Sequence, residues 1–158
     1  MIFSVGATRV GAFLLFVVSG CLGATQARAA DNDVYGSWTV SRILPAGNVA
    51  ALTEAQAKAL IGRIVKYDSA DMNNGIDHFR VKEYHRRTMT DEEFLTENKV
   101  APRKLNLTGR RIIEISVEGK DRDIADQFGT GIYPLDKNRL VVVYGGVAFE
   151  LRRTTAVK

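Results

Sequence analysis

This chain of 158 residues has a single cysteine, Cys21, which lies in the N-terminal apolar segment. A disulfide framework is therefore excluded, and the domain that follows must be stabilised by its own core. Proline is also scarce, with three residues, and Trp38 is the single tryptophan. No apolar run reaches the length of about 20 residues that a permanent transmembrane helix needs.

The first 29 residues have the pattern of a cleaved secretory signal peptide. Arg9 precedes a short apolar run at 12–18, and Ala27-Arg28-Ala29 has the small-residue form of a signal-peptidase cleavage site. Cleavage there predicts a mature domain of residues 30–158 that is periplasmic or secreted, in a bacterial envelope.

A second interpretation of the leader concerns Cys21. Residues 18–21 resemble the lipobox of bacterial lipoproteins, in which the cysteine is acylated and becomes the N-terminus. In that case the domain is anchored to the membrane through a lipid on Cys21, and the residues after it are a tether. Both interpretations predict export.

Charge in the predicted mature domain is nearly balanced. Without Arg9 and Arg28, 20 basic residues face 18 acidic ones, which leaves a net charge of +2. That balance gives no support for nucleic-acid binding.

Short strands dominate the predicted mature domain. Alternation of apolar and polar residues, bounded by turn signals such as Asn73-Asn74-Gly75 and Gly145-Gly146, predicts eight of them. No long helices alternate with the strands, so a parallel sheet is not expected. Closure of the sheet removes exposed edges. We therefore expect a mainly β fold, a single antiparallel barrel of about eight strands. The predicted strands span 35–44, 63–68, 76–85, 105–107, 113–117, 128–135, 139–144 and 147–153.

Two short helices are predicted between the strands. Thr53 with Gln56, and Thr90 with Glu93, have the spacing of a capping box, in which each side chain bonds the backbone N–H of the other residue.

Gly36-Ser37-Trp38, at the start of the first predicted strand, resembles the Gly-x-Trp motif of the lipocalins and the wider calycin group. In that group the tryptophan closes one end of the barrel, and a basic residue of the last strand packs across its ring. The resemblance implies this structural role for Gly36, Trp38 and Arg153. The helix expected between the first two strands departs from the usual lipocalin order.

Two non-enzymatic functions are favoured at this stage, ahead of an enzyme as the third alternative. In the first, the barrel binds a small apolar or amphipathic ligand among inward-facing side chains. In the second, the protein is an interaction module with a packed core, an inhibitor or accessory factor of an envelope enzyme that acts through loops 69–75 and 119–127. The expected ligand-lining residues are Trp38, Val40, Phe79, Val81, Ile113, Ile115, Val143 and Phe149.

No catalytic, cofactor or metal site is predicted. His78 and His85 are seven residues apart on one predicted strand, so they are expected on opposite faces, where they cannot bind one metal ion. No motif assembles a nucleophile with a base.

Overall fold

A computed structural model describes residues 33–44, 50–109, 111–120 and 128–154. The predicted signal peptide, the lipidation candidate Cys21 and most of loop 119–127 lie outside these ranges, so those predictions remain untested.

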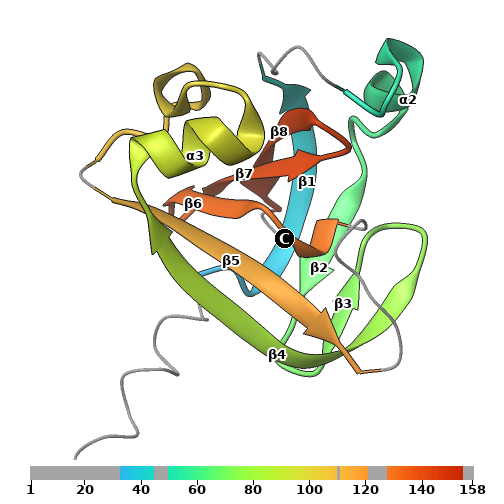
Figure 1. Cartoon of the computed structure of the whole chain (residues 1–158). Helices are drawn as coiled ribbons and strands as arrows, with labels where there is room; N and C mark the ends of the chain where they lie inside the picture. The colour runs from blue at the N-terminus through green and yellow to red at the C-terminus, as the bar shows by residue number, and fades with distance from the viewer. Residues whose placement is uncertain (1–32, 45–49, 110, 121–127, 155–158) are drawn as a thin grey trace, which may run out of the picture.

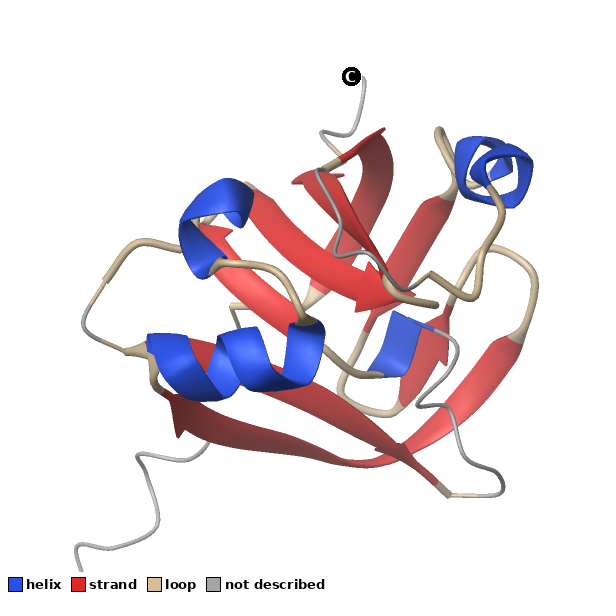
Figure 2. Ribbon diagram, turned by 45° about the horizontal axis from the view of Figure 1, so that its top comes forward, coloured by secondary structure: helices blue, strands red, loops and turns tan. Residues whose placement is uncertain are grey.

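Eight antiparallel strands form a closed barrel in which each strand pairs with the next and β8 pairs with β1. Figures 1 and 2 show the strands wrapping around one interior. This confirms the predicted fold class, a mainly β antiparallel barrel with two short helices. The strands are β1 Gly36–Ile43, β2 Ile64–Tyr67, β3 Asp71–Asn73, β4 His78–Met89, β5 Ile112–Gly119, β6 Ile132–Asp136, β7 Arg139–Tyr144 and β8 Val147–Arg153.

The two predicted helices are α2 (Glu54–Ala59) and α3 (Asp91–Asn98), and both capping boxes are present. At α3, the Glu93 amide donates to Thr90 Oγ1 (3.2 Å) and the Thr90 amide donates to Glu93 Oε2 (2.6 Å). Within the described residues, no helix is long and apolar enough to cross a membrane.

Two details of the predicted strand list are wrong. Residues 105–107 do not pair with the sheet, because Leu105 ends the 3₁₀ helix η1 (Pro102–Leu105) and Asn106 is left-handed, with φ 60°. Conversely, the segment 69–75 was expected to be a turn, but it contains β3. A strand of three residues is too short to show alternation, so its pairing with β2 and β4 identifies it.

The barrel has apolar clusters on both sides of part of its wall. One fills the interior, and a second lies outside, where α3 and η1 cover β5 to β8. Figure 1 shows α3 outside the barrel, beside β6. This double burial explains the continuous apolar run in β7, since a strand covered on both faces needs no polar alternation. Leu140 and Val142 lie in the interior cluster, and Val141 lies in the outer one.

Candidate functional site

The structure brings together the three residues expected to close the barrel. Trp38 is fully buried, and Cζ of Arg153 lies 4.2 Å from the centre of its ring. The indole N–H donates to the carbonyl of Val34 at 2.7 Å, so its polar atom is satisfied. The two strands are neighbours, and Trp38 is the register partner of Arg153.

Gly36 leaves room for the Arg153 guanidinium. A Cβ at this position would lie 2.5 Å from Nη1 of Arg153, and its φ of +127° disfavours any side chain. The guanidinium donates to the carbonyl oxygens of Tyr35 (2.7 Å), Lys137 (2.7 Å) and Asp33 (3.2 Å). The arginine therefore connects residues 33–35 with the β6–β7 turn by hydrogen bonds, in addition to its contact with the indole ring.

Seven of the eight expected lining residues contact the interior cluster. Trp38, Val40, Phe79, Val81, Ile115 and Phe149 are buried in it, and Ile113 packs against it partly buried. Their neighbours are large, fully buried side chains that alternation had not identified as lining: Tyr67, Met72, Phe128, Ile132 and Leu140.

Phe128 and Tyr67 meet inside the barrel. The rings of Phe128 and Phe149 lie 5.8 Å apart between centroids, and the hydroxyl of Tyr67 donates to the carbonyl of Phe128 at 2.8 Å. Burial raises the pKa of the Tyr67 hydroxyl well above its usual range, so it stays protonated and available as a donor. The interior is thus occupied by the protein's own side chains.

Val143 was expected to face inward, and that expectation is wrong. It packs against the outer cluster, and its register partner Ala148 lies in the same cluster. The inward residues of β7 are Leu140 and Val142. Because β7 is apolar on both faces, its composition did not indicate which residues point inward.

The wall opens slightly between β5 and β6. These strands share one register pair, Ile115 with Ile132. Pro134 lies two residues beyond Ile132 on β6, and the β5–β6 register pair does not extend to it. Proline has no N–H to donate, and the ladder stops there.

A hollow of about 130 Å³ lies at this seam. Ligand pockets usually measure about 300–1,000 Å³, so it accommodates a fragment and not a lipid. It is lined by Asn106, Leu107, Thr108, Arg111, Ile112, Ile113, Pro134 and Leu135.

Three isoleucines are exposed in the segments around the start of β2 and the β3–β4 turn. Ile61 follows α2, Ile64 begins β2, and Ile76 lies in the β3–β4 turn; their exposed fractions are 41%, 51% and 71%. Gly75 lies against the Arg63 side chain and the Ile64 carbonyl. The turn and the start of β2 are therefore adjacent. We call these three residues the isoleucine patch.

A β-bulge in β4 changes the faces expected for the histidines. Val81 pairs with Gly119 and Glu83 with Glu118, so one extra residue, Lys82, is inserted. Phe79 and Val81 point inward before the bulge, and Tyr84 packs against the interior cluster after it. His78 and His85 are both exposed outside, so the expectation of opposite faces is wrong.

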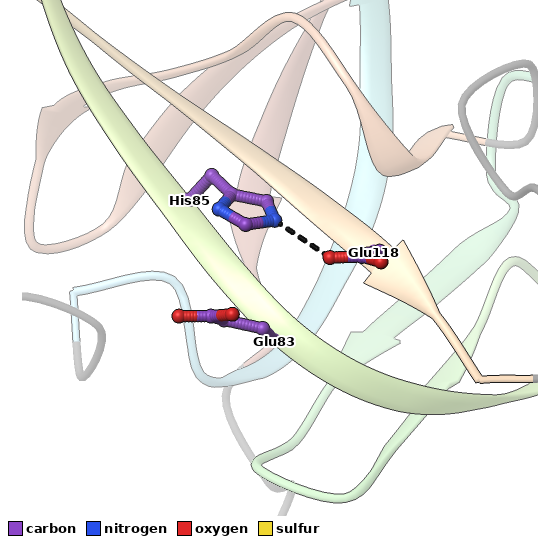
Figure 3. Close-up of side chains that lie close together, drawn as sticks. All are labelled: Glu83, His85 and Glu118. Atoms are coloured by element: carbon purple, nitrogen blue, oxygen red, sulfur yellow. Dashed lines mark hydrogen bonds and ion pairs between the residues drawn. The ribbon is translucent and has the colours of Figure 1, made fainter.

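The bulge also places Glu83 and His85 beside Glu118 of β5 (Figure 3). The ligand atoms of these three side chains lie within 4.8 Å of one another, and His85 Nε2 is 2.9 Å from Glu118 Oε2. Lys82 Nζ donates to Glu118 Oε1 at 2.6 Å. The bonds from Lys82 and, next, from His85 lower the pKa of Glu118, which favours the carboxylate. We call these residues the Glu83–His85–Glu118 cluster.

Sequence reasoning missed this cluster because its third member is on another strand. Glu83 and His85 have the i, i+2 spacing of a strand face, but nothing in the sequence pairs them with Glu118. The burial of Leu140 and Val142 could have been predicted from the sequence. Both belong to the uninterrupted apolar run of β7, and such a run is typical of a strand buried on both faces.

No protein-family model, curated protein or solved structure matches this chain. We therefore infer the function from the arrangement of the side chains in the structure.

Proposed function

We propose that this protein is an exported, non-catalytic interaction module of lipocalin-like type, which binds another envelope protein through the isoleucine patch. The observation that carries the proposal is the filled interior. Large side chains occupy the space in which a binding barrel holds its ligand. Gly36-x-Trp38 with Arg153 across the ring supports the lipocalin-like kinship.

The isoleucine patch is the surface best suited to a protein partner. A β-branched aliphatic side chain gains about 1.5–3 kcal/mol on full burial, so three of them exposed together favour association. Exposed apolar residues of this kind become the buried centre of an interface when a partner covers them.

Arg63 indicates the chemistry of that partner. It lies in sequence between Ile61 and Ile64, its stem packs against Gly75, and it forms no ion pair within the described part of the chain. An arginine flanked by apolar side chains suits an apolar segment of a partner that carries a carboxylate, because the guanidinium binds carboxylates in a bidentate manner.

Capture from envelope extract with three variants tests the proposal. Ile64→Glu and Arg63→Glu place a carboxylate in the patch and are expected to abolish capture of a partner that the unaltered protein retains. The control is Leu95→Glu, which alters another exposed aliphatic residue, 47% exposed on α3. A partner captured equally by all four proteins, or by none, would show that the patch is not the binding surface.

The seam favours a second candidate function, binding of a fragment-sized apolar or amphipathic ligand beside Ile113. Its support is the hollow at Pro134, where the β5–β6 ladder ends. A thermal-shift screen of lipids and small apolar compounds tests it, and Ile113→Trp should fill the hollow and remove any stabilisation. If no compound raises the melting temperature, this function is excluded.

Export is the third element of the proposal, and it is supported by the pattern of residues 1–29. The mass of the mature N-terminus measures it directly. A chain beginning at Ala30 means release into the periplasm or medium, an acylated Cys21 means a lipid anchor, and an intact Met1 would refute export.

A further inference from the structure

The Glu83–His85–Glu118 cluster lies on the outer face of the β4–β5 pair, away from the isoleucine patch and the seam. All three side chains are accessible: Glu83 is exposed, His85 has 52% of its side chain exposed and Glu118 has 40%. Figure 3 shows the imidazole and the Glu118 carboxylate facing each other, with Glu83 on the same strand as His85.

Two carboxylates of the cluster face each other, and the Lys82 ammonium lies 2.6 Å from one of them, Glu118. Glu83 and Glu118 are direct register partners across β4 and β5. Like charges opposite each other destabilise a sheet, and a further cation between the two carboxylates would reduce that repulsion. The bulge at Lys82 creates this pairing, and bulges commonly redirect side chains at functional sites.

The donor types are ones that a transition-metal ion accepts. Zn²⁺ binds imidazole nitrogen and carboxylate oxygen, and open Zn²⁺ sites have three protein ligands and one position for water. Calcium takes 6–8 oxygen ligands, so a histidine and two carboxylates suit it poorly. Around Zn²⁺, with bonds of about 2.0–2.2 Å, ligand atoms lie about 3.3 Å apart. His85 and Glu118 are already at 2.9 Å, and the exposed Glu83 side chain, whose ligand atom lies within 4.8 Å of theirs, must move closer.

We infer that Glu83, His85 and Glu118 bind a first-row divalent transition-metal ion, with Zn²⁺ as the representative probe. His85 supplies Nε2, Glu118 supplies the oxygen that faces it, and Glu83 supplies the third ligand. Lys82 keeps its bond to the other oxygen of Glu118, where its positive charge opposes the incoming cation.

Calorimetric titration of the untagged protein, produced from the full chain, with Zn²⁺ tests the inference. We expect one ion per chain. His85→Ala and Glu83→Gln each alter a proposed ligand, so each should weaken binding by roughly 10-fold or more, at least the loss that follows from altering an outer-shell partner. The matched control is His78→Ala, because His78 is an exposed histidine of the same strand, 3.4 Å from Asp71.

Lys82→Gln separates a metal site from an ordinary ion-pair network. Removing the ammonium takes away a repelling charge, so Zn²⁺ affinity should rise several-fold, whereas a network without a metal gains nothing from that change. Circular dichroism of each variant confirms that it is folded. The inference is overturned if the unaltered protein binds Zn²⁺ no tighter than about 1 mM, if His78→Ala weakens binding as much as His85→Ala, or if Lys82→Gln lowers the affinity.

Discussion

The guanidinium carbon of Arg153 lies 4.2 Å from the centre of the Trp38 ring, and this contact joins the last strand of the barrel to the first. The arginine is partly exposed while the indole is fully buried, so the guanidinium forms the cover over the ring. We call this arrangement of Arg153 over Trp38 the seal. It combines a cation–π contact with three hydrogen bonds to backbone carbonyls.

Arg153→Ala should lower the free energy of unfolding by about 2–3 kcal/mol, because it removes the ring contact and leaves carbonyls without their donor. Arg139→Ala is the control, since this residue forms a solvent-exposed ion pair with Asp136, and such pairs contribute little to stability. Urea unfolding followed by the fluorescence of the single tryptophan measures both. Equal losses would show that the seal does not stabilise the barrel.

Gly36→Ala should destabilise the barrel more than Gly62→Ala. Both glycines have positive φ, +127° and +85°, so each variant pays a backbone cost of about 1–2 kcal/mol. At Gly36 the new methyl group also displaces Arg153, whereas nothing lies within 4 Å at Gly62. In the background of Arg153→Ala the excess cost of Gly36→Ala should disappear, and a persistent excess in this double-mutant cycle would contradict the steric explanation.

Phe149→Ala should cost about 3–5 kcal/mol and open a cavity in the interior, because the surrounding side chains cannot fully collapse. A dry apolar cavity of this kind binds benzene or xenon. Titration with benzene, monitored by thermal shift, should stabilise this variant and leave the unaltered protein unchanged. Stabilisation of the unaltered protein would mean that the interior already contains a cavity.

Thr90→Ala should reduce stability by about 1 kcal/mol, since it removes the cap of α3 and thereby loosens the cover over the outer cluster. Thr96→Ala, at an exposed position within the same helix, should be neutral or slightly stabilising because alanine has the higher helix propensity. Chemical denaturation compares the two, and similar losses would mean that the cap contributes nothing.

Glu150 should make stability depend on pH in the acidic range. Burial opposes its ionisation, but hydrogen bonds from Arg42 (2.5 and 3.1 Å) and Arg152 (3.0 Å) outweigh burial and lower its pKa below the usual 4.5. A carboxylate whose pKa is lower in the folded state stabilises above its unfolded pKa. That stability is lost as the pH falls through the folded pKa.

Glu150→Gln should therefore cost about 1–3 kcal/mol at neutral pH, and this difference should shrink as the pH falls below about 4.5. Glu92→Gln, on the exposed face of α3, is the control and should change little. Denaturation at a series of pH values measures the difference. A gap that stays constant down to pH 3 would exclude ionised Glu150 as the cause.

Features governed by a few neighbouring residues could be predicted from the sequence. Both helix caps were identified because a capping box depends on residues three apart. The turn at Gly145-Gly146 was predicted from the pair of glycines, and both residues adopt a positive φ. The inward face of β8 was also predictable, since Val147, Phe149 and Leu151 alternate with Glu150 and Arg152.

Predictions that assigned residues to the two faces of a strand by strict alternation were less accurate. Val143 was assigned to the wrong face because β7 is apolar on both sides. The two histidines were wrongly expected on opposite faces because Lys82 forms a bulge. One inserted residue reverses every later side chain of a strand, and the bulge depends on pairing with β5, a strand more than 20 residues away.

The sequence by itself determined the fold class. The alternation of apolar and polar residues, the turn residues and the Gly36-x-Trp38 motif are local patterns, and a closed antiparallel barrel satisfies all of them. Tertiary structure alone decided how the interior is filled, where the wall opens at Pro134, and that Glu118 joins Glu83 and His85. These features arise from contacts between strands that are distant along the chain. They depend on strand register and on side-chain volume, and no local sequence pattern encodes either of these.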